Sequence, residues 1–511
     1  MDPGVGGAAA PADPAAIHAR KLAEARGGPL LSNVEWFRSL PEPERVALRG
    51  TVRRKPTRTL SGVAVVAVMT APARCPHGRC TYCPGGIESG SPQSYTGEEP
   101  SALRGAQFGW DARRITEHRL EILEAIGHPT SKVEVIVMGG TFPSRPKAYR
   151  DDVFRGIVEG LNGASSGSLP EALERNESSD HRLVGLTVET RPDWCDEKVL
   201  PDLLDAGVTR VEIGVECLTE PVLAAVHRAH GIDDVARATR ASKDRGLKVA
   251  YHLMLGLPGM DPSTDLADVR RVFEDEAFRP DMLKIYPTLV LPGTELHEQW
   301  ARGEYRPYDT ETAARLLAEI KRIVPPWVRI QRIQRDIPAR LIADGVRTSN
   351  LRQVALARLA ASGGRCRCLR CREPGRPHRT DPEALVLREA EYPASRGREH
   401  FLSFEDPGSD TVAAFLRLRF PADPSEGGLE GPVIRELKVV GPEVPVGAAP
   451  SRSVDLQHRG LGRTLVARAE EIARSAGHRR LFVRSAVGTR PYYRSLGYRR
   501  AGPDMAKGLF V

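Results

Sequence analysis

The chain has 511 residues, of which 41% are hydrophobic and 27% are charged, and its formal net charge is +8. This is the composition of a globular protein, and the length predicts two or three domains rather than a single core. A run of eighteen apolar residues is absent, which excludes a conventional membrane-spanning helix. The positive charge favours an anionic partner such as a nucleic acid, with an arginine-rich solvated surface as the alternative.

The N-terminal residues 1–16 are rich in alanine, proline and glycine. They contain neither a basic region nor a hydrophobic run of the kind found in signal peptides, so we expect a disordered tail on a cytoplasmic protein. A basic helical segment is expected at 17–60, with the stretch "RRKPTR" at 53–58. Disulfides are rare in the cytoplasm, so clustered cysteines in such a chain indicate metal or redox chemistry.

Between residues 61 and 340, β-branched apolar runs alternate with amphipathic helical patterns. We expect strands at 63–69, 133–138, 184–188, 210–216, 248–255, 282–290 and 328–333. Near-continuous apolar strands that alternate with helices are typical of a parallel sheet covered by helices, and six or seven such units predict an α/β barrel or partial barrel. We expect the polar residues 165–180 to form a surface loop.

The stretch "CPHGRCTYCPGG" places three cysteines directly after the first expected strand: Cys75, Cys80 and Cys83. The loops that follow barrel strands form the active face of such folds. Three thiolates cannot complete a tetrahedral zinc site, but they can hold a cubane iron–sulfur cluster and leave one iron open. A zinc knuckle with a distant fourth ligand is the alternative; His77 lies inside the short loop and would be a strained ligand.

Other polar residues lie within or at the ends of the expected strands. Lys284 lies inside an apolar strand, where a lysine needs a carboxylate or phosphate partner or must extend out of the sheet. Glu189 and Arg191 end another strand, where they could contact a zwitterion or simply pair with each other in the core.

The segment 341–395 is expected to be a linker that contains a second cysteine cluster. Its C-x-C-x2-C pattern, formed by Cys366, Cys368 and Cys371 among arginines, predicts a small loop closed by zinc. His378 is the nearest candidate for the fourth ligand, followed by His400. A cluster of reactive surface thiols is the alternative.

From residue 396 to 511, short strands precede one long helix at about 460–477, which predicts a separate α+β domain. Gly460 and Gly462 open this helix, and the free amides of a helix N-terminus bind pyrophosphate. A lone Gly-x-Gly is a weak signal. The preceding strand "VIRELKVV" and the following "SAVGTRPYYRSLGY" strengthen the interpretation as an acyl-CoA site.

The first cysteine motif resembles that of the radical S-adenosylmethionine (SAM) enzymes, but its spacing is four and then two residues instead of three and then two. This variant resembles the catalytic subunit of Elongator and its single-chain bacterial and archaeal relatives. The matching motifs extend from about residue 20 to the C-terminus and include "QSYTGEEPSALR", "KVEVIVMGGTF", "TVETRPD" and "RIQRDIP". The C-terminal domain resembles the GCN5-related acetyltransferases.

The resemblance implies a 4Fe-4S cluster on Cys75, Cys80 and Cys83, with SAM bound beside it. Tyr82 would then lie against the adenine, with ordinary barrel packing as the alternative. Residues at strand ends would contact the rest of SAM: Gly139, Gly140, Thr141, Glu189 and Arg191. The chain departs from the family at Val215-Glu216-Cys217, where the family usually reads Val-Gln-Ser, which casts doubt on any role for these positions. We interpret Cys217 and Cys195 as core residues.

The resemblance also implies an acetyl-CoA site. The open strand that pairs with the pantetheine arm would be formed by Glu436, Leu437, Lys438 and Val439. The pyrophosphate loop would contain His458, Gly460, Leu461, Gly462 and Arg463. Tyr492 and Tyr493 would lie near the thioester, with Tyr493 donating to the leaving thiolate, and Lys132 of the barrel would also contact acetyl-CoA. Packing of the last helix is the alternative for the tyrosines. Single-chain relatives carry a metal loop, which supports zinc on the second cysteine cluster.

As the resemblance implies, SAM cleavage by the reduced cluster produces a radical that takes hydrogen from the methyl group of acetyl-CoA. The resulting carbon radical adds to C5 of a tRNA wobble uridine, and thioester hydrolysis leaves carboxymethyluridine. Lys284, Tyr492 and Tyr493 are the candidate catalytic residues.

The tRNA anticodon loop would be the partner, contacted by basic stretches at 53–58, 329–340 and 365–379. A homodimer and other tRNA-modifying proteins are candidate partners. A protein lysine acetyltransferase with a structural cluster, and a non-enzymatic tRNA-binding scaffold, are the competing hypotheses.

Overall fold

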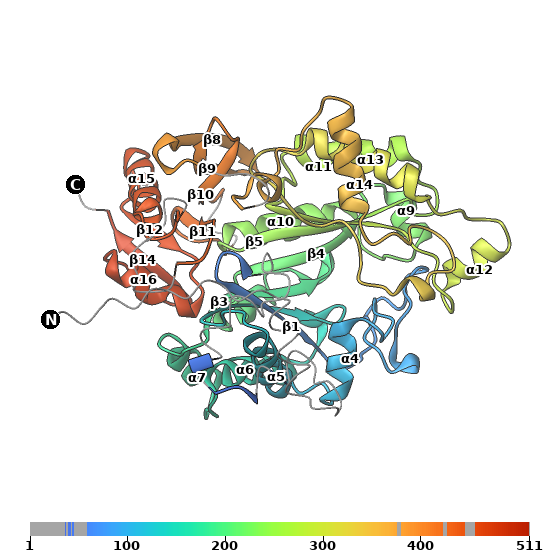
Figure 1. The fold of residues 1–511 in the computed structure, drawn as a ribbon, viewed down its shortest axis with the longest axis horizontal. Coiled ribbons are helices and arrows are strands. Elements are labelled where there is room, and N and C mark those ends of the chain that lie inside the picture. The colour runs from blue at the N-terminus through green and yellow to red at the C-terminus, as the bar shows by residue number, and fades with distance from the viewer. Residues whose placement is uncertain are drawn as a thin grey trace.

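The computed structural model describes residues 36, 39–41, 43–44, 59–375, 380–422, 427–444 and 455–509. The expected N-terminal tail, most of the expected helical segment 17–60 and the candidate zinc ligand His378 lie outside these residues. The described chain contains two seven-stranded sheets, one formed by the N-terminal two thirds and the other by the C-terminal part (Figure 1).

The first sheet is entirely parallel, and its strands follow one another in chain order. The strands are β1 (Val63–Met69), β2 (Lys132–Met138), β3 (Arg182–Thr190), β4 (Arg210–Glu216), β5 (Lys248–Leu255), β6 (Met282–Pro287) and β7 (Arg329–Arg332). Each of the seven predicted strands is present. The expected partial barrel is therefore confirmed, as an open, curled sheet.

Helices cover the convex outer side of this sheet (Figure 1). The helices are α4 (Pro100–Gln107), α5 (Ala112–Ala125), α6 (Lys147–Asn162), α7 (Leu169–Asn176), α8 (Leu200–Asp205), α9 (Glu220–Ala225), α10 (Ile232–Asp244), α11 (Pro262–Glu274), α12 (Glu295–Ala301), α13 (Thr310–Ile323) and α14 (Leu351–Ala361). Of these, α9 and α12 pack instead with the loop after β1 that carries the first three cysteines. Alternate strand residues such as Ala64, Val66 and Val68 are fully buried in the same core as Ile115 of α5. Since alternate residues of a strand point to opposite faces, the remaining residues line the concave interior.

The prediction of a surface loop at 165–180 was wrong, because this segment contains α7. Ser168 caps the helix by accepting a hydrogen bond from the Glu171 backbone amide at 3.3 Å. Pro170 occupies the first turn, and Ala172 and Leu173 are buried. The polar composition concealed one short amphipathic helix.

The second sheet has the order β13-β14-β12-β11-β10-β9-β8 and carries two helices. Its elements are β8 (Val386–Ala394), β9 (Gly397–Asp406), β10 (Thr411–Phe420), β11 (Val433–Val439), α15 (Leu461–Ser475), β12 (Arg480–Val483), α16 (Arg490–Ser495), β13 (Arg499–Ala501) and β14 (Asp504–Gly508). The α+β architecture predicted for the C-terminal part is confirmed. The first strand, β8, lies within the segment that we expected to be a linker and pairs along its whole length with β9.

The second sheet packs against the N-terminal ends of the barrel strands. The backbone carbonyls of Leu60, Leu247 and Trp327, which precede β1, β5 and β7, accept hydrogen bonds from the second sheet and its loops at 2.8, 2.9 and 2.7 Å. The opposite, C-terminal ends of the barrel strands stay free for a site.

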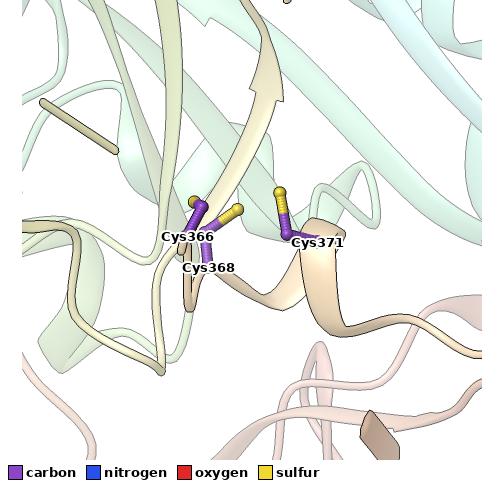
Figure 2. A group of neighbouring side chains, drawn as sticks. All are labelled: Cys366, Cys368 and Cys371. Atoms are coloured by element: carbon purple, nitrogen blue, oxygen red, sulfur yellow. The ribbon is translucent and has the colours of Figure 1, made fainter. Parts of the chain in front are cut away.

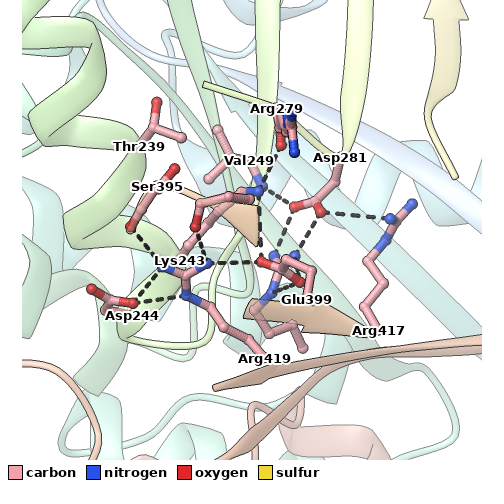
Figure 3. Close-up of polar contacts among 12 residues, drawn as sticks. Thr239, Lys243, Asp244, Val249, Arg279, Asp281, Ser395, Glu399, Arg417 and Arg419 are labelled. Carbon is pink, nitrogen blue, oxygen red and sulfur yellow. Dashed lines mark hydrogen bonds and ion pairs between the residues drawn. The ribbon is translucent and has the colours of Figure 1, made fainter. Parts of the chain in front are cut away.

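A buried network of charges joins the two sheets (Figure 3). Arg435 of β11 is fully buried and donates to both carboxylate oxygens of Asp281, directly before β6, at 2.7 Å each. Arg435 also donates to Glu399 of β9 at 2.7 Å, and Arg419 of β10 reaches Asp244 at 2.6 Å. The Arg435 guanidinium and its neighbours hold the pKa of Asp281 well below its usual range despite burial. Paired in this way, the charges lock β10 and β11 onto the base of the barrel.

None of the helices in the described ranges combines the length and the apolar composition that crossing a membrane requires.

Candidate active site

A pocket opens at the C-terminal ends of the barrel strands, on the face opposite the second sheet. The three predicted cluster ligands line this pocket in the loop after β1: Cys75, Cys80 and Cys83. Each of these three cysteine sulfurs lies within hydrogen-bonding reach of a donor group. The Ser94 amide donates to Cys83 Sγ at 3.1 Å, and the Thr141 hydroxyl and the Arg228 guanidinium reach Cys75 Sγ and Cys80 Sγ at 3.7 Å each. Hydrogen bonds of this kind to cysteine sulfurs tune iron–sulfur clusters, so the surroundings fit a cluster.

Several polar atoms in this pocket are buried without a hydrogen-bond partner among the described residues. Among them are Tyr82 Oη, His77 Nδ1 and one terminal nitrogen of Arg191. Buried polar atoms normally have partners, so these atoms fit a polar ligand in the pocket, as SAM is. Arg191 does not pair with Glu189; it binds Asp193 through two hydrogen bonds of 2.9 and 3.0 Å.

Of the predicted SAM residues, Tyr82, Gly140, Thr141, Glu189 and Arg191 line the pocket. Gly140 has a φ of 89°, and a Cβ at this position would lie 3.6 Å from Cys75 Sγ. Gly139 is not among the lining residues. It packs on Thr70, where a Cβ would lie 2.3 Å from the threonine hydroxyl. Glycine at 139 is therefore explained by packing, and Gly140 by its place beside the cluster ligands.

Lys284 points into the pocket and binds the Glu212 carboxylate; its Nζ also lies 3.8 Å from Glu189. Burial alone would lower the pKa of Lys284, but the carboxylates of Glu212 and Glu189 raise it above its usual value. The ion pair with Glu212 therefore favours the charged form of Lys284. Tyr95 donates a hydrogen bond of 2.8 Å to Glu189 and completes this group.

The sequence did not reveal several pocket residues, among them Tyr95, Glu212, Arg228, His252 and Tyr286. Glu212 is opposite Glu189 in the register of β3 and β4, and His252 is opposite Lys284 in that of β5 and β6. Glu212 and His252 could have been found in the same way as Lys284, because each is a charged or polar residue inside an apolar strand. Glu216, the departure from the family pattern, also lines the pocket and lies 3.3 Å from Arg228.

Only part of the basic stretch 329–340 faces the pocket. Arg332 and Arg335 line it. Arg329 instead forms a buried ion pair with Glu373, and Arg340 pairs with Glu98 on the surface.

The open strand edge expected for acetyl-CoA is present in β11. β12 pairs with β11 only at Val433 and Ile434, whereas β10 pairs with β11 as far as Val439. Beyond residue 434, one backbone edge of β11 therefore lacks a strand partner in the described sheet. The predicted residues Glu436 to Val439 lie on this free edge and are half-buried. An extended arm could add to this edge by backbone hydrogen bonds.

The predicted pyrophosphate loop lies at the start of α15. Gly460 has a φ of 82°, and a Cβ on Gly462 would lie 3.1 Å from Tyr492 Oη. The same Cβ would lie 3.7 Å from both Leu437 and Val439, so the loop adjoins the open edge of β11. His458 precedes the helix with a φ of 64°, and Leu461 and Arg463 lie in its first turn.

The two predicted tyrosines differ in position. Tyr492 is 40% exposed and lies beside Gly462, whereas Tyr493 is buried against Tyr498 with ring centroids 5.9 Å apart. Burial raises the pKa of Tyr493. The structure thus places Tyr492, and not Tyr493, next to the pyrophosphate loop.

Charged side chains in the barrel interior connect these two regions. Lys438 and Glu436 of β11 face Glu134, Arg210 and Lys248 near the base of the barrel, and their charges act on one another. Arg210 pairs with Glu134 and lies 3.4 Å from Glu212, which in turn binds Lys284 in the pocket. Lys132 also lies at the base, where burial lowers its pKa and the nearby Glu443 opposes this effect. A series of side chains that are paired or act on one another electrostatically therefore extends from β11 to Lys284 in the cysteine pocket, and we call this series the polar path.

The second cysteine cluster brings three sulfurs together within 4.8 Å of one another: Cys366, Cys368 and Cys371 (Figure 2). Zinc–sulfur bonds of about 2.3 Å in a tetrahedron place sulfurs about 3.8 Å apart, so this spacing suits one ion. Hydrogen bonds from the Cys366 and Cys371 thiols hold the pKa of the Cys368 thiol well below its usual range. Lys321 is fully buried, and its Nζ lies 3.4 Å from Cys366 Sγ and 3.6 Å from Cys371 Sγ. His400, the second candidate ligand, lies on β9 and faces Glu391 at 4.0 Å.

Three family models match the chain. The Radical SAM superfamily matches residues 70–270, the Radical SAM C-terminal domain matches 280–361, and the acetyltransferase (GNAT) domain matches 453–509. The fold and the site therefore define a radical SAM enzyme joined to a GNAT acetyltransferase domain, and the Radical SAM family implies a 4Fe-4S cluster and SAM.

Known proteins that resemble this chain over most of its length identify the family more specifically. The tRNA uridine(34) acetyltransferase of Methanocaldococcus jannaschii is 46% identical over 94% of this chain and 90% of its own length. Human Elongator complex protein 3 is 43% identical over 93% and 89%. The solved structure of archaeal Methanocaldococcus infernus Elp3, with residues 1–46 deleted, has a TM-score of 0.77 and 41% identity and covers 88% of this chain and all of that one. The chain belongs to the family of tRNA uridine(34) acetyltransferases and Elongator complex protein 3.

Proposed function

We propose that this chain modifies the wobble uridine of tRNA at C5 and uses acetyl-CoA and SAM-derived radical chemistry to form carboxymethyluridine. The observation that carries the proposal is the polar path through the barrel. It joins an acyl-CoA edge at the base to a cysteine pocket at the other end. A protein lysine acetyltransferase has no need of this connection, and the names of the relatives do not favour that alternative.

Cys75, Cys80 and Cys83 would hold the cluster, and Tyr82, Gly140, Glu189 and Arg191 would contact SAM. When bound, these cofactors supply a carbon-centred radical; the chain positions and shields the reacting groups. Lys284 contributes a fixed positive charge that can face a uracil carbonyl oxygen. A base splayed out of the anticodon loop could enter beside Arg332 and Arg335, which would bind its phosphates.

Acetyl-CoA would lie along the free edge of β11, with its pyrophosphate at the N-terminus of α15. Glu436 and Lys438 on this edge act electrostatically on charged residues of the barrel interior, and Lys132 lies near Glu443 at the base of the barrel. From there the acetyl group would extend along the polar path toward the pocket. Tyr492, whose hydroxyl lies beside Gly462, would contact the CoA there.

For the second cluster we propose zinc on Cys366, Cys368 and Cys371, with the buried Lys321 ammonium offsetting the thiolate charge. For the domains we propose a barrel at 61–340, a linker with the metal loop at 341–395 and the acetyltransferase domain at 396–511. A cytoplasmic location, a homodimer and contacts with other tRNA-modifying proteins remain predictions.

The test is anaerobic incubation of the reconstituted protein with tRNA, acetyl-CoA, SAM and a reductant, followed by mass spectrometry of the nucleosides. The wild type should form carboxymethyluridine, and Cys80→Ser should form none, because one cluster ligand is lost. Cys195→Ser changes a buried cysteine outside the pocket and should retain the product. Absence of the product from the wild type, or its persistence in Cys80→Ser, would overturn the proposal.

A further inference from the structure

The imidazole of His252 lies in the wall of the cysteine pocket, held by a buried carboxylate. Its Nε2 is 3.0 Å from Glu212, whose side chain is completely buried. Burial would raise the pKa of Glu212, but Lys284, His252 and Arg210 hold it well below its usual range, so the group is a carboxylate. A carboxylate at one ring nitrogen fixes the tautomer with the proton on Nε2 and leaves Nδ1 as an acceptor.

The other titratable groups that line this part of the pocket are engaged elsewhere. The ammonium group of Lys284 is bound to Glu212, and Glu189 accepts a hydrogen bond from the Tyr95 hydroxyl. Tyr286 lies edge-on to His252 with ring centroids 5.8 Å apart, and burial raises its pKa. The second imidazole of the pocket, His77, has its Nε2 3.2 Å from Cys80 Sγ, on the cluster side. His252 lines the pocket, and within the described ranges its one hydrogen bond is made by Nε2 to Glu212, which leaves Nδ1 as an acceptor.

The proposed reaction requires a base in this pocket. Once the acetyl carbon is bonded to C5 of uracil, a single methylene separates the thioester carbonyl from the base. Hydrolysis of that thioester must then take place where the uracil is held, rather than at the distant tyrosines of α16.

We propose that His252, oriented by Glu212, is the general base that activates water for hydrolysis of the uridine-bound CoA thioester; this inference rests on the proposed function. Nδ1 takes one proton from water while the oxygen adds to the thioester carbonyl. The C–S bond then breaks, the electron pair leaves with sulfur, and the imidazolium returns its proton to the CoA thiolate. The products are CoA thiol and the carboxylic acid, which ionises; no electron is gained or lost.

The experiment compares wild type, His252→Gln and His252→Ala under the same reaction conditions. Glutamine keeps a donor toward Glu212 but is no base, and alanine leaves space for added imidazole. His297→Ala is the matched control, since His297 lies on α12 away from the pocket-lining residues. The measurements are 5′-deoxyadenosine, carboxymethyluridine and tRNA that still carries CoA through the thioester, each by mass spectrometry.

Both His252 variants should still form 5′-deoxyadenosine and should accumulate uridine joined to CoA, while the carboxymethyluridine rate falls by about 100-fold or more. Imidazole should restore the rate of His252→Ala. Carboxymethyluridine formed at the wild-type rate by the variants, or loss of product without the CoA adduct and without rescue, would overturn the inference. If the wild type itself forms no carboxymethyluridine, it is the proposed function that fails.

Discussion

At the residue scale, Lys321 explains how three thiols are packed together in the protein interior. Cys366 and Cys368 are buried, and Cys371 is half-buried. Thiolates, not thiols, bind metal, and three of them around a divalent ion leave one excess negative charge. The fully buried Lys321 ammonium contacts two of the three sulfurs and offsets that charge. Closely spaced thiols beside a buried cation suit a metal site better than a set of reactive surface thiols.

A metal analysis tests this interpretation. The purified protein should contain about one zinc per chain, and Cys371→Ser should lose most of it because a ligand is removed. Iron bound after cluster reconstitution should stay unchanged, since Cys371 lies outside the cluster pocket. Cys195→Ser is the matched control and should retain zinc. Equal zinc contents in Cys371→Ser and wild type would refute the assignment.

The need of a single residue for a partner was predictable where a charged side chain stood within an apolar segment. Lys284 in an apolar strand required a partner, and the structure supplies Glu212. The identity of that partner could not be predicted, because it depends on how β4 and β6 curve toward one another on the concave face. The partner of Arg191 was also not predictable; the local Asp193, and not Glu189, satisfies it.

At the element scale, the acyl-CoA site that we propose depends on the divergence of β11 and β12. The two strands pair at only two positions and then separate, which leaves the β11 edge open. The start of α15 closes one side of this space, and Gly462 keeps it clear. A larger side chain at 462 would therefore occupy the space between the helix and the strand.

Gly462→Val should weaken acetyl-CoA binding by at least about tenfold, equivalent to about 1.4 kcal/mol, as measured by isothermal titration calorimetry. The reason is steric: a Cβ alone would already lie 3.1 Å from Tyr492 Oη. Ala467→Val places the same side chain on an exposed position of the same helix and should bind acetyl-CoA normally. Equal affinity of Gly462→Val and wild type would show that acetyl-CoA does not occupy this space.

Elements with a strong apolar pattern were predictable, and short or polar ones were not. Strands β3 to β6 are largely buried, and β1 and β2 bury alternate residues within runs rich in valine, which explains their agreement with the prediction. β7 is only four residues long and buries one of them. β8 has mostly exposed residues, and β13 and β14 are only three and five residues long, so their sequences carry little signal. α7 was missed because its caps and polar face dominate its composition.

At the scale of the whole molecule, the C-terminal part closes the base of the barrel with a buried network of charges as well as with apolar contacts such as those of Val487 and Tyr392. Arg435, Asp281 and Glu399 are essentially fully buried, and Arg435 forms an ion pair with each of the two carboxylates. Removing one member of such a network would leave an uncompensated buried charge, which typically costs about 3–5 kcal/mol. This network fixes β11, and with it the acyl-CoA edge, relative to the strands that carry the pocket residues.

This arrangement was not predictable from the sequence motifs. The motifs indicated a cluster and an acyl-CoA site, but they did not show that the two lie at opposite ends of one barrel interior. Glu134, Arg210 and Lys248 are charged residues at the starts of strands, and in the sequence they resemble ordinary surface positions. These residues link β11 to the pocket residues only because β11 packs over them in the folded protein.

The central claim is that the radical formed in the pocket reaches an acetyl group delivered from the base of the barrel. The most direct test is reaction with acetyl-CoA whose methyl group is fully deuterated, in the presence of tRNA, SAM and a reductant. Mass spectrometry of the recovered 5′-deoxyadenosine should find one deuterium transferred from the acetyl group. Recovery of 5′-deoxyadenosine without deuterium, alongside turnover of SAM, would contradict the account.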